Sequence, residues 1–514
     1  MQSKTLRTLA LAAVSAQCFG LGSVEAQTLQ HPATKPVNEE TGTRVFHHEN
    51  VLGTSLELKL RVADSARAAK AENAVLAEID RCDRILSAWR ADSEFSRWAS
   101  TQGTAVPVSA ELMDVLYLFD GWRRQTGGAL DASAESATRL WRQAALTGVA
   151  PTAAERAAVV RQMQAPHWTL DRVAGTATHL DDAPLALNSF AKSYIAGRAA
   201  DAALAAGAKG VLLNIGGDLV MRGDWTERVA IADPRADAEN DEPIDMVRVA
   251  NRALATSGTY RRGVELDGAH LSHILDPRTA EPAMHVLSAT VIAPDASEAG
   301  ALATAFSVMK PFESEALAAQ LRQVDYLLVL ADGRRVESPG WAAHQLPRIV
   351  RTAYLPPVKA AQNLDLVITL ELARINDPRY RRPYVSVWVE DKDRYPVKTI
   401  ALWFDKVRWL PDLKGWYRDD QVRSLAEGTD LSTTISAATR PPGKYTLRWD
   451  GRDNAGKPVK PGKYTLCIEL AREHGGHQLV EQVIDFDGRT AAKFTLPGGA
   501  ELAGATLDYG VHAK

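Results

Sequence analysis

The sequence predicts two folded parts, an α+β domain followed by an immunoglobulin-like β-sandwich domain, and three observations support this division. The chain has 514 residues, which is too long for one ordinary hydrophobic core. Up to about residue 350, segments with helical spacing of apolar residues are mixed with strand-like segments, as in α+β domains. After the prolines at 356 and 357, strand patterns rich in Val, Ile, Trp and Tyr dominate, and helix signals nearly vanish. We therefore expect domains at 27–350 and 364–514, joined by a linker at 351–363.

The first 26 residues have the composition of a cleaved export signal. Lys4 and Arg7 form a short basic start, residues 9–21 are apolar or small, and residues 24–26 end in small side chains at the spacing that signal peptidase reads. The apolar run is too short to span a membrane, and no later segment looks transmembrane. We expect a signal peptide at 1–26 and a mature chain that lies in the periplasm without a transmembrane segment.

The overall composition is that of a soluble globular protein, with 46% hydrophobic and 24% charged residues. The net charge of −3 lacks the basic excess of a nucleic-acid-binding surface, so we expect no nucleic acid partner. Without the signal, Cys82 and Cys467 are the remaining cysteines, and they lie far apart in the sequence. An exported protein with so few cysteines is stabilised by its cores, and we expect no disulfide between these two.

Periodicity indicates the first elements of the α+β domain. Residues 45–64 alternate apolar and polar side chains and predict paired strands. Residues 65–89 place apolar side chains at helical spacing and predict a helix with one buried stripe. An Asp-Ser pair at 92–93 is a cap signal for a short helix. Two further helical stretches are expected around 109–126 and 152–164.

The second half of this domain combines strands, a glycine turn and small-residue helices. Residues 185–207 read as a loop that opens a helix rich in alanine. Residues 210–219 read as a buried strand that runs into a Gly-Gly turn. A further helix is expected at 299–308, and residues 324–333 read as a closing strand.

The C-terminal domain contains a short internal repeat. PGKYTLRW (442–449) and PGKYTLCI (461–468) bracket DGRDNAGKPVK, whose Asp-Gly and Ala-Gly pairs are turn formers. Together with the dense strand patterns, this arrangement predicts a hairpin-rich β-sandwich of the immunoglobulin type.

Four short strings in the middle of the chain carry most of the functional information. They are LLNIGGDLVMRGDW (212–225), ALATSGTYRR (253–262), HILDPRTAEP (273–282) and LSATVIAP followed by ALATA (287–305). Each string alone is commonplace, since a Gly-Gly pair usually only ends a strand and a threonine in an alanine-rich helix usually only packs. Their joint order, however, resembles the FAD:protein FMN transferase (ApbE) family.

The resemblance covers residues 45–335 and implies an activity. Members of the family move FMN from FAD to a Ser or Thr hydroxyl of a target protein and release AMP. Such a transfer depends on positioning and positive charge more than on covalent help from the enzyme. The resemblance therefore implies FAD as substrate, Mg²⁺ as cofactor, and a flavinylated periplasmic or membrane redox protein as partner.

The resemblance also assigns site residues, block by block. The matching blocks are VLGTSLEL (51–58), LSAWRADSEFSRW (86–98), TGGALDAS (126–133), LALNSFAKSY (185–194), HILDPR (273–278) and ALATA (301–305). The residues expected to bind FAD are Leu52, Trp89, Ala129, Leu130, Asp131, Ala186, Lys192, Gly216, Gly217, Ser257 and Leu275. The residues expected to be catalytic are Lys192, Asp276 and Arg278. The expected metal ligands are the carbonyl of Ser189 and the hydroxyl of Thr304.

Two positions depart from the family pattern. Ala186 stands where the family motif LDLGG has its acid, and Gly300 stands where the metal-binding aspartate of ADALATA is expected. Because Mg²⁺ often takes one or two carboxylates in near-octahedral oxygen ligation, tight binding requires that another acid enter the site. The candidates are Asp218, Asp295 and Glu298.

These departures leave two alternatives to the transferase open. One is a catalytically weakened FAD-binding protein. The other is an FAD pyrophosphatase, in which water attacks FAD and gives FMN and AMP. The C-terminal part resembles the β-rich domain of unknown function that is often fused to, or encoded beside, flavin transferases, and its WDGRDNAGKPVKPGKY string resembles the immunoglobulin-like repeat of flagellar hook-cap proteins.

Overall fold

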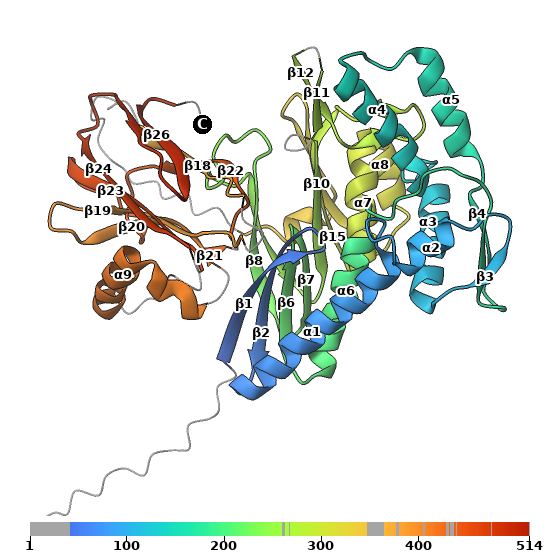
Figure 1. The fold of residues 1–514 in the computed structure, drawn as a ribbon, viewed down its shortest axis with the longest axis horizontal. Helices are drawn as coiled ribbons and strands as arrows, with labels where there is room; N and C mark the ends of the chain where they lie inside the picture. Colours follow the sequence, from blue (N-terminus) through green and yellow to red (C-terminus); the bar gives the residue numbers. More distant parts are fainter. Residues whose placement is uncertain are drawn as a thin grey trace, which may run out of the picture. The chain divides into compact units, whose positions relative to one another are not determined.

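The computed structural model describes residues 42–512, apart from 260–262, 267, 347–363, 377–379, 405–406, 428–430, 432–435, 438 and 474 (Figure 1). The expected export signal (1–26) and linker (351–363) lie outside the described residues. Among the helices that the structure describes, none is long and apolar enough to cross a membrane. We call residues 42–346 the N-terminal part and residues 364–512 the C-terminal part.

The N-terminal part contains both helices and strands. Its strands are β1 (Gly42–Val51), β2 (Thr54–Val62), β3 (Ala105–Pro107), β4 (Trp168–Asp171), β5 (Thr176–His179), β6 (Gly210–Ile215), β7 (Asp218–Gly223), β8 (Thr226–Ile231), β9 (Asp245–Ala250), β10 (Ala253–Gly258), β11 (Gly263–Leu266), β12 (Ala269–Ser272), β13 (Leu275–Asp276), β14 (Glu281–Pro282), β15 (Val286–Ala293), β16 (Asp325–Leu330) and β17 (Arg335–Glu337). Its helices are α1 (Ser65–Leu86), α2 (Glu94–Ala99), α3 (Ala110–Gln125), η1 (Ala132–Ala134), α4 (Glu135–Thr147), α5 (Ala153–Gln164), α6 (Ala191–Ala205), α7 (Ala296–Val308), α8 (Pro311–Ala318) and η2 (Trp341–Ala343).

An eight-stranded antiparallel sheet organises the N-terminal part, in the order β1-β2-β6-β7-β10-β15-β16-β17. Helices α1, α6 and α7 lie together along the sheet, and α6 and α7 pack on its central strands (Figure 1). Val211 and Leu213 of β6 belong to the core on the helix side, whereas Leu212 belongs to the core on the opposite face. Because this strand is buried on both faces, its sequence is a continuous apolar run rather than an alternating one.

The short helix predicted after the Asp-Ser pair begins where its cap signal indicated. Ser93 caps α2, its hydroxyl accepting a hydrogen bond from the Ser96 amide at 3.0 Å. Thr152 and Glu155 form a capping box at the start of α5. The apolar stripe of α1 is buried at Val75 and Cys82, among other positions. These elements confirm the α+β architecture.

A charged network holds the middle of α1 against α6, the helix whose start lies in the candidate site. Glu78 accepts hydrogen bonds from Arg81 and from Arg198 of α6, both at 2.8 Å. Arg81 also reaches Glu111 of α3 at 2.8 Å. The Arg81 hydrogen bonds, together with Arg198 and against the opposing effect of burial, lower the pKa of Glu78 to about 2.

We expect Glu78→Gln to lower the free energy of unfolding by about 1 kcal/mol at pH 7, after allowance for solvent screening of this partly exposed network. Because the pKa of Glu78 is lower in the folded chain than in the unfolded chain, its contribution is present above about pH 4.5 and is lost as the pH falls toward 2. Urea unfolding of both proteins from pH 7 to pH 3 should show the difference shrinking. Asp80→Asn, which removes an exposed pair with Arg84 on the same helix, is the control and should change little. A difference that stays constant with pH would contradict this account.

The C-terminal part is β-rich. Its strands are β18 (Asp365–Leu372), β19 (Tyr384–Glu390), β20 (Pro396–Trp403), β21 (Ser436–Ala437), β22 (Gly443–Trp449), β23 (Gly462–Ala471), β24 (His477–Phe486), β25 (Ala492–Leu496) and β26 (Leu502–Gly510), and its helices are η3 (Val407–Asp412) and α9 (Lys414–Glu427). One sheet has the order β22-β18-β26-β25 and the other β21-β20-β19-β23-β24. Both contribute side chains to one apolar core, for example Ile368 and Val387.

Two features of the C-terminal part were not foreseen from the sequence. The two repeat copies form β22 and β23, which lie in opposite sheets. Helix α9 had no clear signal in the sequence, because its buried residues are mostly polar and leave no apolar stripe. Arg423, for example, is fully buried and bonds to Asp420 and Glu427. Cys82 and Cys467 are both free and buried, as expected.

Candidate active site

The Gly-Gly turn predicted from the sequence joins β6 to β7 and lies against the first residues of β2. Gly216 has φ +57° and donates its amide to the Ser55 carbonyl at 3.1 Å. A Cβ atom at Gly216 would lie 2.6 Å from the Thr54 hydroxyl, so this position has no room for a side chain. Gly216 and Gly217 are exposed, and Leu52, just before Gly53, is half-buried with φ +49°. The turn therefore leaves exposed backbone next to the start of β2.

The start of α6 meets α7 and β10 at the two predicted metal ligands. The Thr304 hydroxyl donates a hydrogen bond to the Ser189 carbonyl at 3.0 Å. Ser257 at the end of β10 lies 3.4 Å from the same hydroxyl. These groups come from segments more than 40 residues apart in the sequence, and the structure brings all three together as a small cluster of oxygen atoms.

A lysine and a carboxylate lie beside this cluster. The Lys192 ammonium is 3.4 Å from Oδ2 of Asp218, the first residue of β7. The Ser193 hydroxyl donates to the same oxygen at 2.6 Å. Gly300 lies next to this pair, because a Cβ atom built on it would collide with the Ser193 hydroxyl. Ser193 was not predicted as a site residue, although the family motif LDLGGIAKGY has glycine at this position and the serine was visible as a difference.

Hydrogen bonds between charged side chains of the HILDPR loop fix its conformation. Asp276 accepts hydrogen bonds from the Arg278 amide at 2.8 Å and from its guanidinium at 2.9 Å. The same guanidinium reaches Glu313 of α8 at 3.0 Å. The hydrogen bonds to these carboxylates raise the pKa of Arg278. The side-chain stem of Arg278 lies near Gly128, so this loop borders the TGGALDAS segment.

Several other predicted site residues make contacts that stabilise the surrounding fold. The Asp131 carboxylate pairs with Arg123 at 2.9 Å and caps η1 through the Ser133 amide at 2.8 Å. The Ala186 amide donates a hydrogen bond to the Ala132 carbonyl at 2.9 Å, and this bond connects the loop before α6 to η1. The side chains of Ala129, Leu130, Asp131 and Leu275 are buried. Trp89, between α1 and α2, is by contrast 74% exposed.

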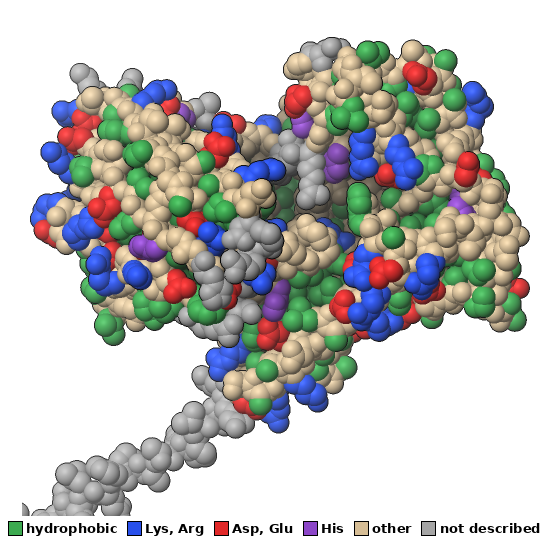
Figure 2. Space-filling view, in the orientation of Figure 1, with side chains coloured by type: hydrophobic (Ala, Val, Ile, Leu, Met, Phe, Trp, Pro, Cys, Tyr) green, Lys and Arg blue, Asp and Glu red, His purple; other side chains and the backbone are tan. Residues whose placement is uncertain are grey.

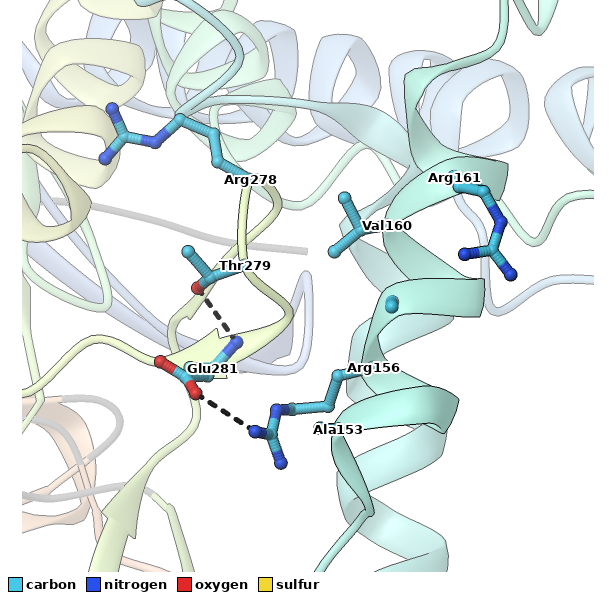
Figure 3. A pocket seen from close by; sticks show the side chains of 8 residues that line it. Ala153, Arg156, Val160, Arg161, Arg278, Thr279 and Glu281 are labelled. Atoms are coloured by element: carbon cyan, nitrogen blue, oxygen red, sulfur yellow. Dashed lines mark hydrogen bonds and ion pairs between the residues drawn. The ribbon is translucent and has the colours of Figure 1, made fainter.

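A pocket of about 480 Å³ lies between α5 and the turn that follows β13 (Figure 3). Arg156 of α5 crosses toward Glu281 at 3.4 Å, and Thr279 bonds the Glu281 amide at 3.2 Å. Of the predicted site residues, Arg278 lines this pocket, with its guanidinium directed away from it. The pocket thus adjoins the HILDPR loop and is separate from the oxygen cluster at Thr304.

The oxygen cluster has the chemistry of a site for a phosphate-bound divalent cation. In the part of the chain that the structure describes, no three His, Cys, Asp or Glu side chains gather as a metal site. Mg²⁺ does not need such a group when a substrate supplies phosphate oxygens, since it then takes one or two carboxylates and keeps several waters. The Ser189 carbonyl, the Thr304 hydroxyl and the nearby Asp218 carboxylate fit this requirement.

Two family models match the chain. The "ApbE family" model matches residues 52–328, and the model "Predicted periplasmic protein (DUF2271)" matches residues 365–504. An FAD:protein FMN transferase of Klebsiella pneumoniae (strain 342) is 30% identical over 311 residues, which cover 58% of this chain and 87% of the relative. The FAD:protein FMN transferase of Escherichia coli (strain K12) is 29% identical over 279 residues, covering 51% of this chain and 77% of the relative.

Solved structures share the fold of the N-terminal part. The crystal structure of the ApbE protein from Thermotoga maritima has a TM-score of 0.53 and 24% identity, and the match covers 60% of this chain and 100% of that chain. A mutant of the flavin transferase ApbE from Vibrio cholerae has a TM-score of 0.50 and 25% identity, covering 59% and 99%. Since the family model matches more than half of its residues, this chain belongs to the ApbE family and carries a DUF2271 domain behind its ApbE domain.

Proposed function

We propose that the chain is an exported FAD:protein FMN transferase that acts in the periplasm on a Ser or Thr of a redox protein. The observation that carries this proposal is the pair of contacts around the start of α6, one between Thr304 and the Ser189 carbonyl and the other between Lys192 and Asp218. A cation and a diphosphate both find their preferred partners in such a cluster. The transferases named above and the periplasmic description of the C-terminal family support the same assignment.

In the proposed reaction, the hydroxyl oxygen of the target attacks the phosphorus of the FMN half of FAD. A new O–P bond forms, the bond from that phosphorus to the bridging oxygen breaks, AMP leaves with the bridging oxygen, and the hydroxyl proton passes to solvent. Lys192 places a positive charge beside the diphosphate as its charge shifts toward AMP. Bound Mg²⁺ would neutralise the diphosphate, with Ser189, Thr304 and Asp218 as the protein groups that hold it.

The remaining site residues keep their proposed roles around FAD. Exposed backbone at Gly216 and Gly217 allows close approach of the cofactor beside Leu52 and Ser257, and exposed Trp89 offers a ring for stacking. Asp276 and Arg278 shape the loop at the edge of the site through their mutual hydrogen bonds. The buried Ala129, Leu130, Asp131 and Leu275, with Ala186, would act through backbone groups and through the shape of the walls.

The proposal includes the organisation of the whole chain. It assigns residues 1–26 to a signal peptide, 27–350 to the transferase domain, 351–363 to a linker and 364–514 to a sandwich of the immunoglobulin type. The two sheets around one core support the last assignment. On the face drawn in Figure 2, basic and acidic side chains are interspersed, which agrees with a partner other than nucleic acid.

FAD pyrophosphatase activity is the second candidate, favoured by the same oxygen cluster with water in place of a target hydroxyl. To separate the candidates, the purified mature chain is incubated with FAD and Mg²⁺, with and without an envelope fraction of the source organism, and AMP is measured. We expect AMP release that depends on the envelope fraction. Equal AMP release without the fraction would indicate hydrolysis. FAD binding without AMP in either arm would contradict both enzyme activities and leave a binding protein.

A further inference from the structure

Positions 193 and 300 are coupled in this chain. A side chain at Gly300 would occupy the space that the Ser193 hydroxyl now fills. Gly300 lies one turn before Thr304 on α7, so the two positions lie on the same side of the helix. A carboxylate side chain at position 300 would project from α7 on the side of Thr304. Ser193 occupies the space that this side chain would need.

Ser193 uses this space to hold a carboxylate from another element. Its hydroxyl donates to Oδ2 of Asp218 at 2.6 Å, and Asp218 is nearly buried. Lys192 contacts the same oxygen at 3.4 Å. Both contacts of Asp218 among the described residues are made through Oδ2, so Oδ1 has no partner within that part of the chain. A nearly buried carboxylate with one uncommitted oxygen has a ligating atom available.

We propose that Asp218 supplies the carboxylate of the cation site in this chain, that Ser193 is its positioning residue, and that Gly300 is required because it leaves room for Ser193. The acid thus comes from β7 and not from α7. The inference rests on the proposed function for the nature of the ligand, a divalent cation bound to the diphosphate of FAD. It deepens that function by naming Ser193 and Gly300 as the residues that allow Asp218 to take the place of the missing aspartate.

A purely structural Ser193–Asp218 hydrogen bond would give different behaviour. In that case, Asp218→Asn would change stability alone, since asparagine keeps the size of the side chain and its amide still accepts a hydrogen bond from Ser193. As a cation ligand, Asp218 contributes a negative charge that asparagine lacks. Cation affinity therefore separates the two roles.

The test measures Mn²⁺ binding in the presence of FAD by the electron paramagnetic resonance of free Mn²⁺. We expect Asp218→Asn to weaken binding at least tenfold and Ser193→Ala to weaken it severalfold. Asp224→Asn is the matched control, since it removes a 73% exposed carboxylate from the turn after the same strand. It should leave Mn²⁺ affinity unchanged. FAD fluorescence quenching without metal shows whether each variant still folds and binds FAD.

A second set of variants keeps the proposal falsifiable even if Asp218→Asn folds poorly. Gly300→Asp alone should lower the melting temperature and fail to strengthen Mn²⁺ binding, because its side chain collides with Ser193. Gly300→Asp combined with Ser193→Gly should bind Mn²⁺ whether residue 218 is Asp or Asn. Asp218→Asn with wild-type affinity, a tighter-binding Gly300→Asp, or a wild-type chain that binds no Mn²⁺ beside FAD would each overturn the proposal. If Asp218 controls Mn²⁺ binding but no AMP is ever released, the cation site stands and the proposed transferase function fails.

Discussion

Lys192→Ala should lower the rate of AMP release from FAD about 100-fold while the chain stays folded. The Lys192 ammonium lies 3.4 Å from Asp218, and in the proposed reaction it is the protein's own positive charge beside the diphosphate. Because charge moves toward AMP as the P–O bond breaks, this ammonium should act more on kcat than on FAD affinity. A coupled assay for AMP at saturating FAD measures the effect.

Lys70→Ala, which removes an exposed lysine from α1, is the control for a general change of charge. Lys192→Arg tests geometry, since it keeps the charge but presents a planar guanidinium in place of a compact ammonium. We expect it to recover part of the lost rate. If Lys192→Ala releases AMP at the wild-type rate, Lys192 is not the phosphate-side residue.

Gly216→Ala should weaken FAD binding at least tenfold and lower the free energy of unfolding by about 2 kcal/mol. The backbone at Gly216 has φ +57°, which costs an alanine about 1 kcal/mol. The added Cβ would also lie 2.6 Å from the Thr54 hydroxyl and 2.7 Å from its methyl group. Relief of that collision must move Thr54 or the turn, and both border the exposed backbone proposed to contact FAD.

The Gly175→Ala variant is a control that separates the effect of backbone strain at a positive φ from the effect of a steric collision. Gly175 has φ +67° in the turn between β4 and β5, and a Cβ atom there meets nothing within 4 Å. This control should lose about 1 kcal/mol of stability through backbone strain and keep its FAD affinity. Urea unfolding and FAD fluorescence titration of both variants provide the comparison. Equal effects of the two substitutions on FAD affinity would mean that the Gly216 turn is not part of the FAD site.

Local patterns were enough to predict the framework of the candidate site. The Gly-Gly turn at 216–217 follows from a buried strand that ends in two glycines, and the start of α2 follows from its cap. The approach of Thr304 to Ser189 was implied by the family resemblance, and the structure shows it as a hydrogen bond. In these cases, a few neighbouring residues or a family motif are enough to predict the local structure.

Features that depend on long-range packing were not predictable in the same way. Asp218 was one of three possible acids in the sequence, and only the folded chain places it against Ser193. The sequence alone also suggests that Gly300→Asp would restore the family's site, whereas the structure shows Ser193 occupying that space. Helix α9 was missed because it buries charged residues such as Arg423, which a hydrophobic pattern cannot detect.

The most direct test of the transferase assignment is the covalent transfer itself. The purified mature chain is incubated with FAD and Mg²⁺ and with envelope proteins from a source strain that lacks this chain. Denatured proteins are then separated on a gel and scanned for flavin fluorescence, and AMP is measured in the same reactions. We expect a fluorescent band that resists denaturation, increases with AMP, and is absent with the Lys192→Ala variant. AMP that accumulates without any covalent flavin, or covalent flavin that forms equally without the chain, would contradict the transferase assignment.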